Sequence, residues 1–314
     1  MPPSDPAARL LAAFRRARPV RAIPLIVTVF GDAVAPHGGR AWLGALIRLL
    51  APLGVSERLV RTSVFRLARE HWLRAETLGR RSDYLLTEFG QRQIDAAARH
   101  IYAPARPAWD GRWRMLVALP GKWAAREREH LRRSLAWQGF GQLSGGVFVH
   151  PSTPLDEALA ALDTEDFPAL SAKLFALTGE GRGDRERIVR AAWELAELSR
   201  AYGAFVRRYQ PLAAATGGVD DPERAFLLRT LLIHDYRRLL LRDPELPDDL
   251  LPAHWHGRGA RALTVQLYRQ LAAPSEAHLR RHLLTADGSH PPLAPEFFDR
   301  FGGIARRRAL SAAD

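Results

Sequence analysis

The sequence contains no cysteine among its 314 residues. This absence excludes disulfide bonds, thiol nucleophiles and thiolate metal sites, and it fits a reducing compartment. The sequence also has no apolar run near the ~18 residues that a membrane-spanning helix requires, since the best candidate is residues 24–30 and Asp32 follows it closely. The amino-terminal segment lacks the apolar core and the cleavage site of a signal peptide. We therefore expect a cytoplasmic protein with no membrane partner.

Lysine is nearly absent, with two residues beside 44 arginines, and the formal net charge is +12. Residues 1–108 carry 17 basic side chains against 8 acidic ones, so nine of the twelve excess positive charges lie in one third of the chain. A coding bias would explain arginine in place of lysine, but it would not explain this concentration. The uneven charge is typical of a module that binds a polyanion, and it favours nucleic acid over a merely soluble basic surface.

Residues 53–86 are the most informative segment. Ser56 follows a proline–glycine break and is a favourable N-cap, so the sequence predicts that a helix begins there. At about 100° per residue, one side of that helix carries Val60, Val64, Leu67 and His71. The other side carries Arg58, Thr62, Phe65, Arg66 and Arg69, with Arg61 at its edge. A short helix that packs by one side and exposes arginines and a threonine on the other suits a DNA major groove.

The segments around this helix have the order of a winged helix-turn-helix. Two apolar helical patterns precede it, at residues 25–34 and 41–50. A basic hairpin follows, with its two strands at residues 73–78 and 84–86 and its turn at residues 79–83. Thr87 then caps a closing helix that ends near residue 102.

Two changes in composition divide the rest of the chain. A proline-rich linker lies at residues 103–108, and a glycine-rich run lies at residues 179–184. Between them the sequence predicts a strand, a helix, a hairpin that turns at Gly145 and Gly146, a helix and a strand, at residues 112–119, 124–137, 139–151, 155–162 and 169–178. This order is typical of a split βαβ, ferredoxin-like fold. Beyond the glycine-rich run, helices are predicted at residues 185–209, 222–242, 258–271 and 275–284.

The expected fold class is therefore α+β, with several domains. The predicted divisions are an amino-terminal arm, a winged helix-turn-helix domain, a ferredoxin-like middle domain and an α-helical carboxy-terminal domain, at residues 1–20, 21–102, 107–182 and 183–314. The chain ends in a basic tail that is either solvated or in contact with phosphate, and that contains Arg306, Arg307 and Arg308.

The sequence resembles the PaaX family of bacterial repressors of phenylacetic acid catabolism. The resemblance extends over roughly residues 20–285. It is carried by residues 56–67, residues 84–90, Trp113, the pair Leu119-Pro120, residues 228–238, residues 242–247, residues 250–252 and Trp255. It implies a homodimeric repressor with a winged-helix DNA module, a middle domain similar to the Cas2 ferredoxin-like fold, and a helical carboxy-terminal domain. It also implies release from DNA by an acyl-CoA effector, which is phenylacetyl-CoA in the best-known case.

The predicted DNA-binding residues are Ser56, Arg58, Arg61, Thr62, Arg66, Arg69, Arg80 and Arg81. Arginine pairs bidentately with guanine, and threonine donates a hydrogen bond or packs against a thymine methyl group. Arg80 and Arg81, at the hairpin, would meet phosphate or the minor groove. The competing interpretation is that the arginines only solubilise the helix or pair with Glu57 and Glu70.

An acyl-CoA site requires an apolar slot for the acyl group and cations for the phosphates. Four aromatic residues could supply the slot: Trp123, Trp137, Tyr236 and Trp255. Four basic residues could supply the cations: Lys122, Arg126, Arg237 and Arg238. The competing interpretation is that the aromatic residues belong to the core.

No catalytic residue and no cofactor are expected. A metal-dependent nuclease that docks through the winged helix is the alternative function, but the strand at residues 112–119 ends without a carboxylate to hold a metal ion. His234, Asp235, His254 and His256 could hold a metal, although structural hydrogen bonds are the favoured interpretation. No Gly-x-Ser-x-Gly motif indicates a hydrolase. A third hypothesis is an architectural DNA-binding protein without an effector.

Overall fold

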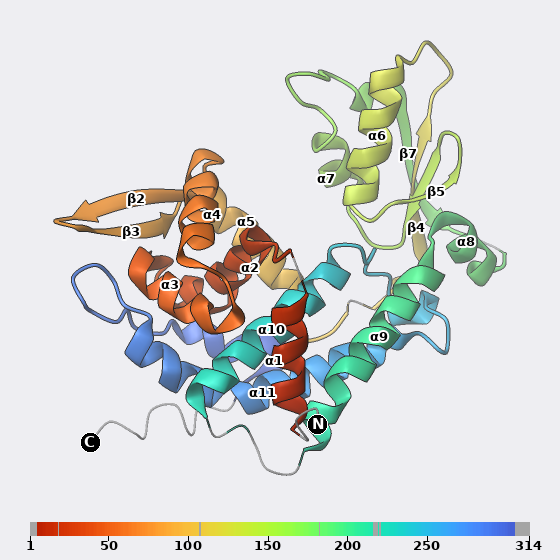
Figure 1. Cartoon of the computed structure of the whole chain (residues 1–314). Coiled ribbons are helices and arrows are strands. Elements are labelled where there is room, and N and C mark those ends of the chain that lie inside the picture. Colours follow the sequence, from red (N-terminus) through yellow and green to blue (C-terminus); the bar gives the residue numbers. More distant parts are fainter. Residues whose placement is uncertain are drawn as a thin grey trace. The chain divides into compact units, whose positions relative to one another are not determined.

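The computed structural model describes residues 5–17, 19–106, 108–181, 183–215, 219 and 221–304 (Figure 1). The chain divides into two compact units. The first unit comprises Met1–Ala105, Gly203–Arg238 and Arg258–Asp314, and the second comprises Arg106–Tyr202 and Leu239–Gly257. The fold is mixed α and β, with one antiparallel sheet in each unit. None of the described helices combines the length and the hydrophobicity needed to cross a bilayer.

The amino-terminal part of the first unit is a helical core with a small sheet. Its helices are α1 (Pro6–Arg16), α2 (Ala22–Val29), α3 (Leu43–Leu50), α4 (Glu57–Arg69) and α5 (Glu88–Ile101), and a π-helical turn (Phe30–Val34) extends α2. Its strands are β1 (Arg40–Trp42), β2 (Leu73–Leu78) and β3 (Arg81–Leu86), in the order β1-β3-β2. Leu25, Leu46, Val60 and Val64 are fully buried, so the apolar sides of α2, α3 and α4 form one core.

Three sequence expectations for this part were wrong in detail. The helix predicted at residues 41–50 begins only at Leu43, because Arg40–Trp42 form strand β1, which pairs with β3. The turn predicted at residues 79–83 is shorter, since Leu78 already pairs with Arg81. His71 does not belong to the buried side of α4: it follows the helix, has a φ of 60° and is exposed.

The second unit contains a four-stranded antiparallel sheet. The elements follow in the order β4 (Arg112–Ala118), α6 (Ala125–Trp137), β5 (Gly141–Ser144), β6 (Val147–His150), α7 (Leu155–Ala160) and β7 (Leu174–Glu180). The strand order β5-β6-β4-β7 is that of a split βαβ, ferredoxin-like unit, as predicted. Helices α6 and α7 cover one face of the sheet (Figure 1), where Leu116, Leu131, Leu135 and Phe148 form the core. The last strand begins at Leu174, later than predicted, because residues 171–173 form a 3₁₀ turn.

In the described part of the chain, four α-helices follow: α8 (Arg185–Ala192), α9 (Leu195–Ala214), α10 (Pro222–Leu240) and α11 (His256–His282). The helix predicted at residues 185–209 is interrupted at Trp193, whose backbone is extended and whose indole Nε1 donates a hydrogen bond to the carbonyl of Gly139 at 2.9 Å. The two helices predicted at residues 258–271 and 275–284 are instead one helix that contains Pro274. Because these helices contribute to both compact units, the predicted division into three domains stays a prediction. The basic tail at residues 306–308 lies outside the described residues.

A buried ionic cluster lies in the core of the first unit. Arg229 of α10 is fully buried, with its Nε 2.9 Å from Oδ2 of Asp32 and its Nη1 2.6 Å from Oε1 of Glu276. Tyr268 donates a further hydrogen bond to Asp32 at 2.8 Å. Burial alone would raise the pKa of Glu276, but Arg229 and the His37 side chain, 3.3 Å away, together outweigh it and hold that pKa at about 2. The cluster therefore joins the π-helical turn to α10 and α11 through buried charges that depend on one another.

Candidate nucleic-acid interface

Helix α4 begins where its sequence predicts. The Ser56 side chain accepts a hydrogen bond from the backbone N–H of Leu59 at 3.3 Å, so Ser56 is the N-cap. Val60, Val64 and Leu67 are buried, and α4 packs against α2 and α3 through this side. Packing of this buried side fixes α4 in an orientation that leaves its opposite side at the surface.

The outward side of α4 carries the predicted DNA-binding residues. Arg61 pairs with Glu57 at 2.7 Å, and Arg66 pairs with Glu70 at 2.7 Å. Exposed pairs of this kind contribute about 0.3–0.5 kcal/mol on a helix, so a phosphate or a guanine can displace the glutamate at little cost. In the unbound helix the arginines are therefore exposed, as DNA contact requires, and two of them also form weak pairs with glutamates, as the competing interpretation expected.

The other candidates differ in how they are held. Thr62 donates its hydroxyl hydrogen bond to the carbonyl of Arg58 at 3.0 Å. Arg58, Arg69 and Arg80 are exposed, and no ion pair joins any of them to a residue in the described part of the chain. These three arginines are the cations on α4 and the hairpin turn that are available to an anionic partner without breaking an ion pair.

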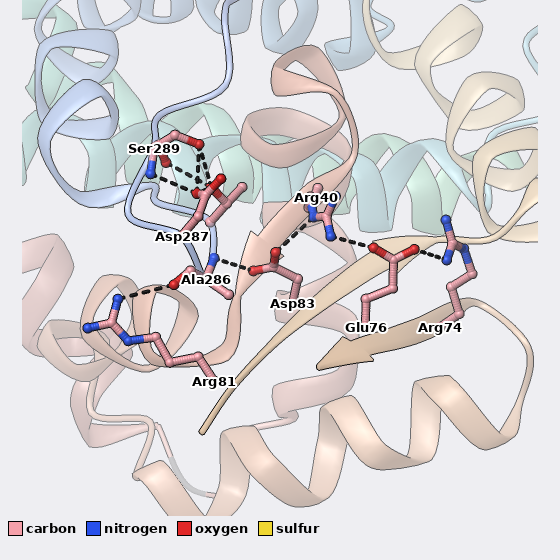
Figure 2. Close-up of polar contacts among 9 residues, drawn as sticks. Arg40, Arg74, Glu76, Arg81, Asp83, Ala286, Asp287 and Ser289 are labelled. Atoms are coloured by element: carbon pink, nitrogen blue, oxygen red, sulfur yellow. Dashed lines mark hydrogen bonds and ion pairs between the residues drawn. The ribbon is translucent and has the colours of Figure 1, made fainter. Parts of the chain in front are cut away.

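The β2–β3 hairpin is fixed by a polar network that the sequence did not predict (Figure 2). Asp83 of β3 is buried and accepts hydrogen bonds from the backbone N–H of Ala286 at 2.7 Å and from Nε of Arg40 at 2.8 Å. Arg81 donates to the carbonyl of Ala286 at 3.1 Å, and its guanidinium lies 4.8 Å from the ring centroid of Trp42. The hairpin is therefore attached to the segment that follows α11, and Arg81 is anchored there.

The same network reduces the positive charge of the hairpin. Glu76 of β2 forms ion pairs with both Arg40 and Arg74 (Figure 2). The hydrogen bond from Arg74 is the main cause that lowers the pKa of Glu76, so this carboxylate is charged at neutral pH. Among the described residues of the hairpin, the side chain of Arg80 in the two-residue turn has neither an ion pair nor a hydrogen bond, whereas Arg81 has no ion pair but is held by Ala286 and Trp42.

The predicted effector residues of the second unit do not share one slot. The indole Nε1 of Trp123 donates to the carbonyl of Leu119 at 3.1 Å, and Lys173 lies 5.4 Å from the Trp123 ring. Trp137 is 78% exposed at the other end of α6, about 20 Å away at 1.5 Å per residue. Trp255 is buried and packs edge-to-face on Tyr202. The exposed cations Lys122 and Arg126 lie near Trp123 in sequence, and Arg126 approaches the ring of Phe167 at 6.0 Å.

The predicted effector residues of the first unit are also separated. Tyr236 is buried against Phe205, whereas Arg238 is exposed. Arg237 lines a cavity of about 20 Å³ together with residues that include Thr28 and Tyr102. Burial lowers the pKa of Arg237, whose Nη2 donates to a backbone carbonyl at 3.2 Å. This cavity has room for about one water molecule, so an acyl group could enter only after the side chains move apart.

The histidines have structural partners. His234 is buried, and its Nδ1 lies 3.1 Å from the hydroxyl of Thr28. The Nδ1 of His256 lies 3.0 Å from the hydroxyl of Ser199, whereas His254 is exposed. Within the described ranges, no group of three or more histidine and acidic side chains is arranged to hold a metal ion. His234 and His256 thus each lie within hydrogen-bonding distance of a side-chain hydroxyl.

Comparisons with known proteins give the family. The PaaX-like protein model matches residues 21–90, the PaaX protein central Cas2-like domain matches residues 106–189, and the PaaX-like protein C-terminal domain matches residues 193–281. The transcriptional repressor PaaX of Escherichia coli strain K12 is 37% identical over 296 residues, which cover 91% of this chain and 92% of the relative.

A solved structure is also similar. An uncharacterized protein from Mycobacterium tuberculosis is 26% identical and superposes with a TM-score of 0.54, covering 79% of this chain and 96% of its own. These relatives are regulatory or uncharacterized proteins, so the comparisons give no support to the nuclease alternative. The three domain matches and the 37% identity together show that the chain belongs to the PaaX family of transcriptional repressors.

Proposed function

We propose that this protein represses transcription by binding an operator duplex through a winged helix-turn-helix, in which α3 and α4 form the helix pair and the β2–β3 hairpin is the wing. The observation that carries the proposal is the division of α4 into two sides. Its inner side is buried and sets the angle of the helix, while its outer side presents arginines and Thr62 to solvent. The 13 residues of α4 span about 20 Å, which suits a major groove.

The roles of the basic residues follow from how each is held. Arg58 and Arg69 are free to contact bases or phosphates, and Arg61 and Arg66 become free when their glutamate partners are displaced. Arg80 lies in the wing turn, where a cation positions the duplex through phosphate without specifying its sequence. A homodimer would present two such modules to the two halves of an inverted repeat.

Arginine-to-alanine substitution tests the proposal. Arg61→Ala should reduce operator affinity by about 1–3 kcal/mol and weaken the preference for the operator over a scrambled duplex. Arg92→Ala is a matched control, because Arg92 lies on α5, is 62% exposed and pairs with Glu88 four residues earlier, as Arg61 does with Glu57. Fluorescence anisotropy with labelled duplexes measures both variants. Equal affinities for the two variants and the wild type would exclude Arg61 from the reading surface.

We further propose that phenylacetyl-CoA or another acyl-CoA releases the repressor from the operator of an aromatic-acid catabolic operon. The support is the family membership together with exposed cations beside Trp123 that suit the phosphates of coenzyme A. Release requires that the effector bind the DNA-free state more tightly than the DNA-bound state, and a difference of about 3 kcal/mol would weaken operator binding about a hundredfold.

Titration of the protein–operator complex with phenylacetyl-CoA tests this regulation by an effector. Free coenzyme A and phenylacetate are the control ligands. Dissociation by the thioester alone supports the proposal. If no aryl- or aliphatic acyl-CoA changes the operator affinity, the protein binds DNA without this effector, as the architectural hypothesis expects.

A further inference from the structure

Phe65 is an exposed aromatic residue in the middle of the outer side of α4. Its side chain is 62% exposed, and the described part of the chain makes no aromatic stacking contact with it. Arg61 and Thr62 precede it by four and three residues and Arg69 follows it by four, so these side chains border it on the helix surface. Most of its apolar surface stays in water, so it contributes only part of the burial free energy that a core phenylalanine contributes. Because most of the side chain is uncovered in the free protein, a partner is the natural source of the contacts that it lacks.

The surroundings of Phe65 indicate the chemistry of that partner. The ring is bordered by guanidinium groups, so a partner that covers it must also be anionic. A second copy of the same surface would bring like charges together, which is unfavourable. A DNA major groove offers both features that the surface needs, because phosphates border the groove and the thymine C5 methyl is the apolar group exposed on its floor.

We propose that Phe65 reads a thymine in the operator by packing its ring against the C5 methyl group of that base. The inference rests on the proposed DNA-binding function and adds to it a specificity-determining residue. The arginines around the ring would fix the position of α4 through phosphates and guanines. The ring would then favour a thymine over the other bases at one or two positions of each half-site.

Thr62 is the competing thymine reader, because its methyl group lies on the same side of α4. Its hydroxyl donates to the carbonyls of Arg58 and Leu59 at 3.0 and 3.2 Å, so the hydroxyl is turned toward the helix backbone. The two candidates are separable, since Thr62→Ser removes only a methyl group and Phe65→Ala removes only the ring.

The test uses deoxyuridine, which differs from thymidine only by the C5 methyl. A tight-binding duplex is first selected from a random pool with the wild-type protein, and each thymine in it is then replaced singly by deoxyuridine. The dissociation constant of every duplex is measured for the wild type and for Phe65→Ala. At one or two thymines, the wild type should lose about fourfold in affinity, the equivalent of one buried methyl group. Phe65→Ala should lose nothing at those positions, and Phe65→Leu should retain most of the effect.

Phe175→Ala is the matched control, because Phe175 is a phenylalanine that is 54% exposed on β7 of the second unit, outside the proposed DNA-binding module. It should show the same deoxyuridine losses as the wild type. Equal losses in wild type and Phe65→Ala at every thymine would overturn the proposal, as would a Phe65→Ala defect that is uniform across all duplexes. Loss of the effect in Thr62→Ser alone would assign the reading to Thr62. If the wild type selects no preferred duplex, the proposed function itself fails, which is a different result.

Discussion

Replacing Arg229 by methionine should strongly destabilise the first unit. The substitution keeps most of the volume of the side chain but removes the charge that is 2.9 Å from Asp32 and 2.6 Å from Glu276. Asp32 and Glu276 are 2% and 5% exposed, so neither carboxylate can recover its hydration. Removing one partner of a buried ion pair costs about 3–5 kcal/mol. The excess negative charge left in the interior is only partly offset by Arg300, 3.1 Å from Asp32, and by His37, 3.3 Å from Glu276.

The pH dependence of the variant should differ in sign from that of the wild type. In the wild type, the folded-state pKa of Glu276 is about 2, below its ordinary value of 4.5, so its contribution to stability is present above about pH 4.5 and is lost as the pH falls toward 2. Burial is the largest single influence on the pKa of Glu276, and without Arg229 it is opposed by His37, 3.3 Å away, so we expect this pKa to rise above 4.5. The variant should therefore regain stability as the pH falls through that raised pKa toward about 4.5, the ordinary pKa of the group.

Urea denaturation followed by far-ultraviolet circular dichroism measures both effects. A loss of 3–5 kcal/mol should lower the midpoint of unfolding by about 1–2.5 M urea at pH 7. Arg224→Met is the matched control, because Arg224 is on the same helix but is 30% exposed and pairs with a half-exposed Asp5. It should cost less than about 1 kcal/mol. If Arg229→Met also lost less than about 1 kcal/mol of unfolding free energy, the core would not depend on the charge of Arg229.

Two further predictions concern the hairpin. Asp83→Ala leaves the N–H of Ala286 and the Nε of Arg40 without their acceptor, although Arg40 keeps Glu76. We expect a loss of about 1–3 kcal/mol and faster amide hydrogen exchange in β2 and β3. Unchanged exchange would contradict the anchoring role. Arg80→Ala should weaken binding to operator and scrambled duplexes alike, and should lower by about one the slope of log affinity against log salt concentration. Arg81→Ala should mainly lower the melting temperature, because Arg81 is held by Ala286 and Trp42. If Arg81→Ala instead weakens DNA binding and Arg80→Ala does not, Arg81 and not Arg80 contacts DNA.

The elements that were predicted correctly depend on local signals. Ser56 and Thr87 cap the helices that follow them through hydrogen bonds to residues three positions later. The alternation of buried and exposed residues along α4 is likewise a property of one short segment. The basic outer side of α4 was therefore predictable, together with the glutamates that pair with Arg61 and Arg66.

The features that were missed depend on distant partners. Strand β1 exists because Trp42 pairs with Asp83, 41 residues further along the chain. The interruption at Trp193 follows from its hydrogen bond to Gly139. The anchoring of Arg81 requires Ala286, 205 residues away. No pattern within a short window indicates which of these contacts the folded chain will make, so periodicity and capping signals cannot predict them.

The affinity of the purified protein for the duplex of its own promoter, relative to a scrambled duplex of equal length at about 0.15 M salt, tests the central claim most directly. If the outer side of α4 reads base pairs, the promoter should bind at least about a thousandfold more tightly. Equal affinities that fall in parallel as the salt concentration rises would show that the arginines bind only phosphate, and would contradict the account.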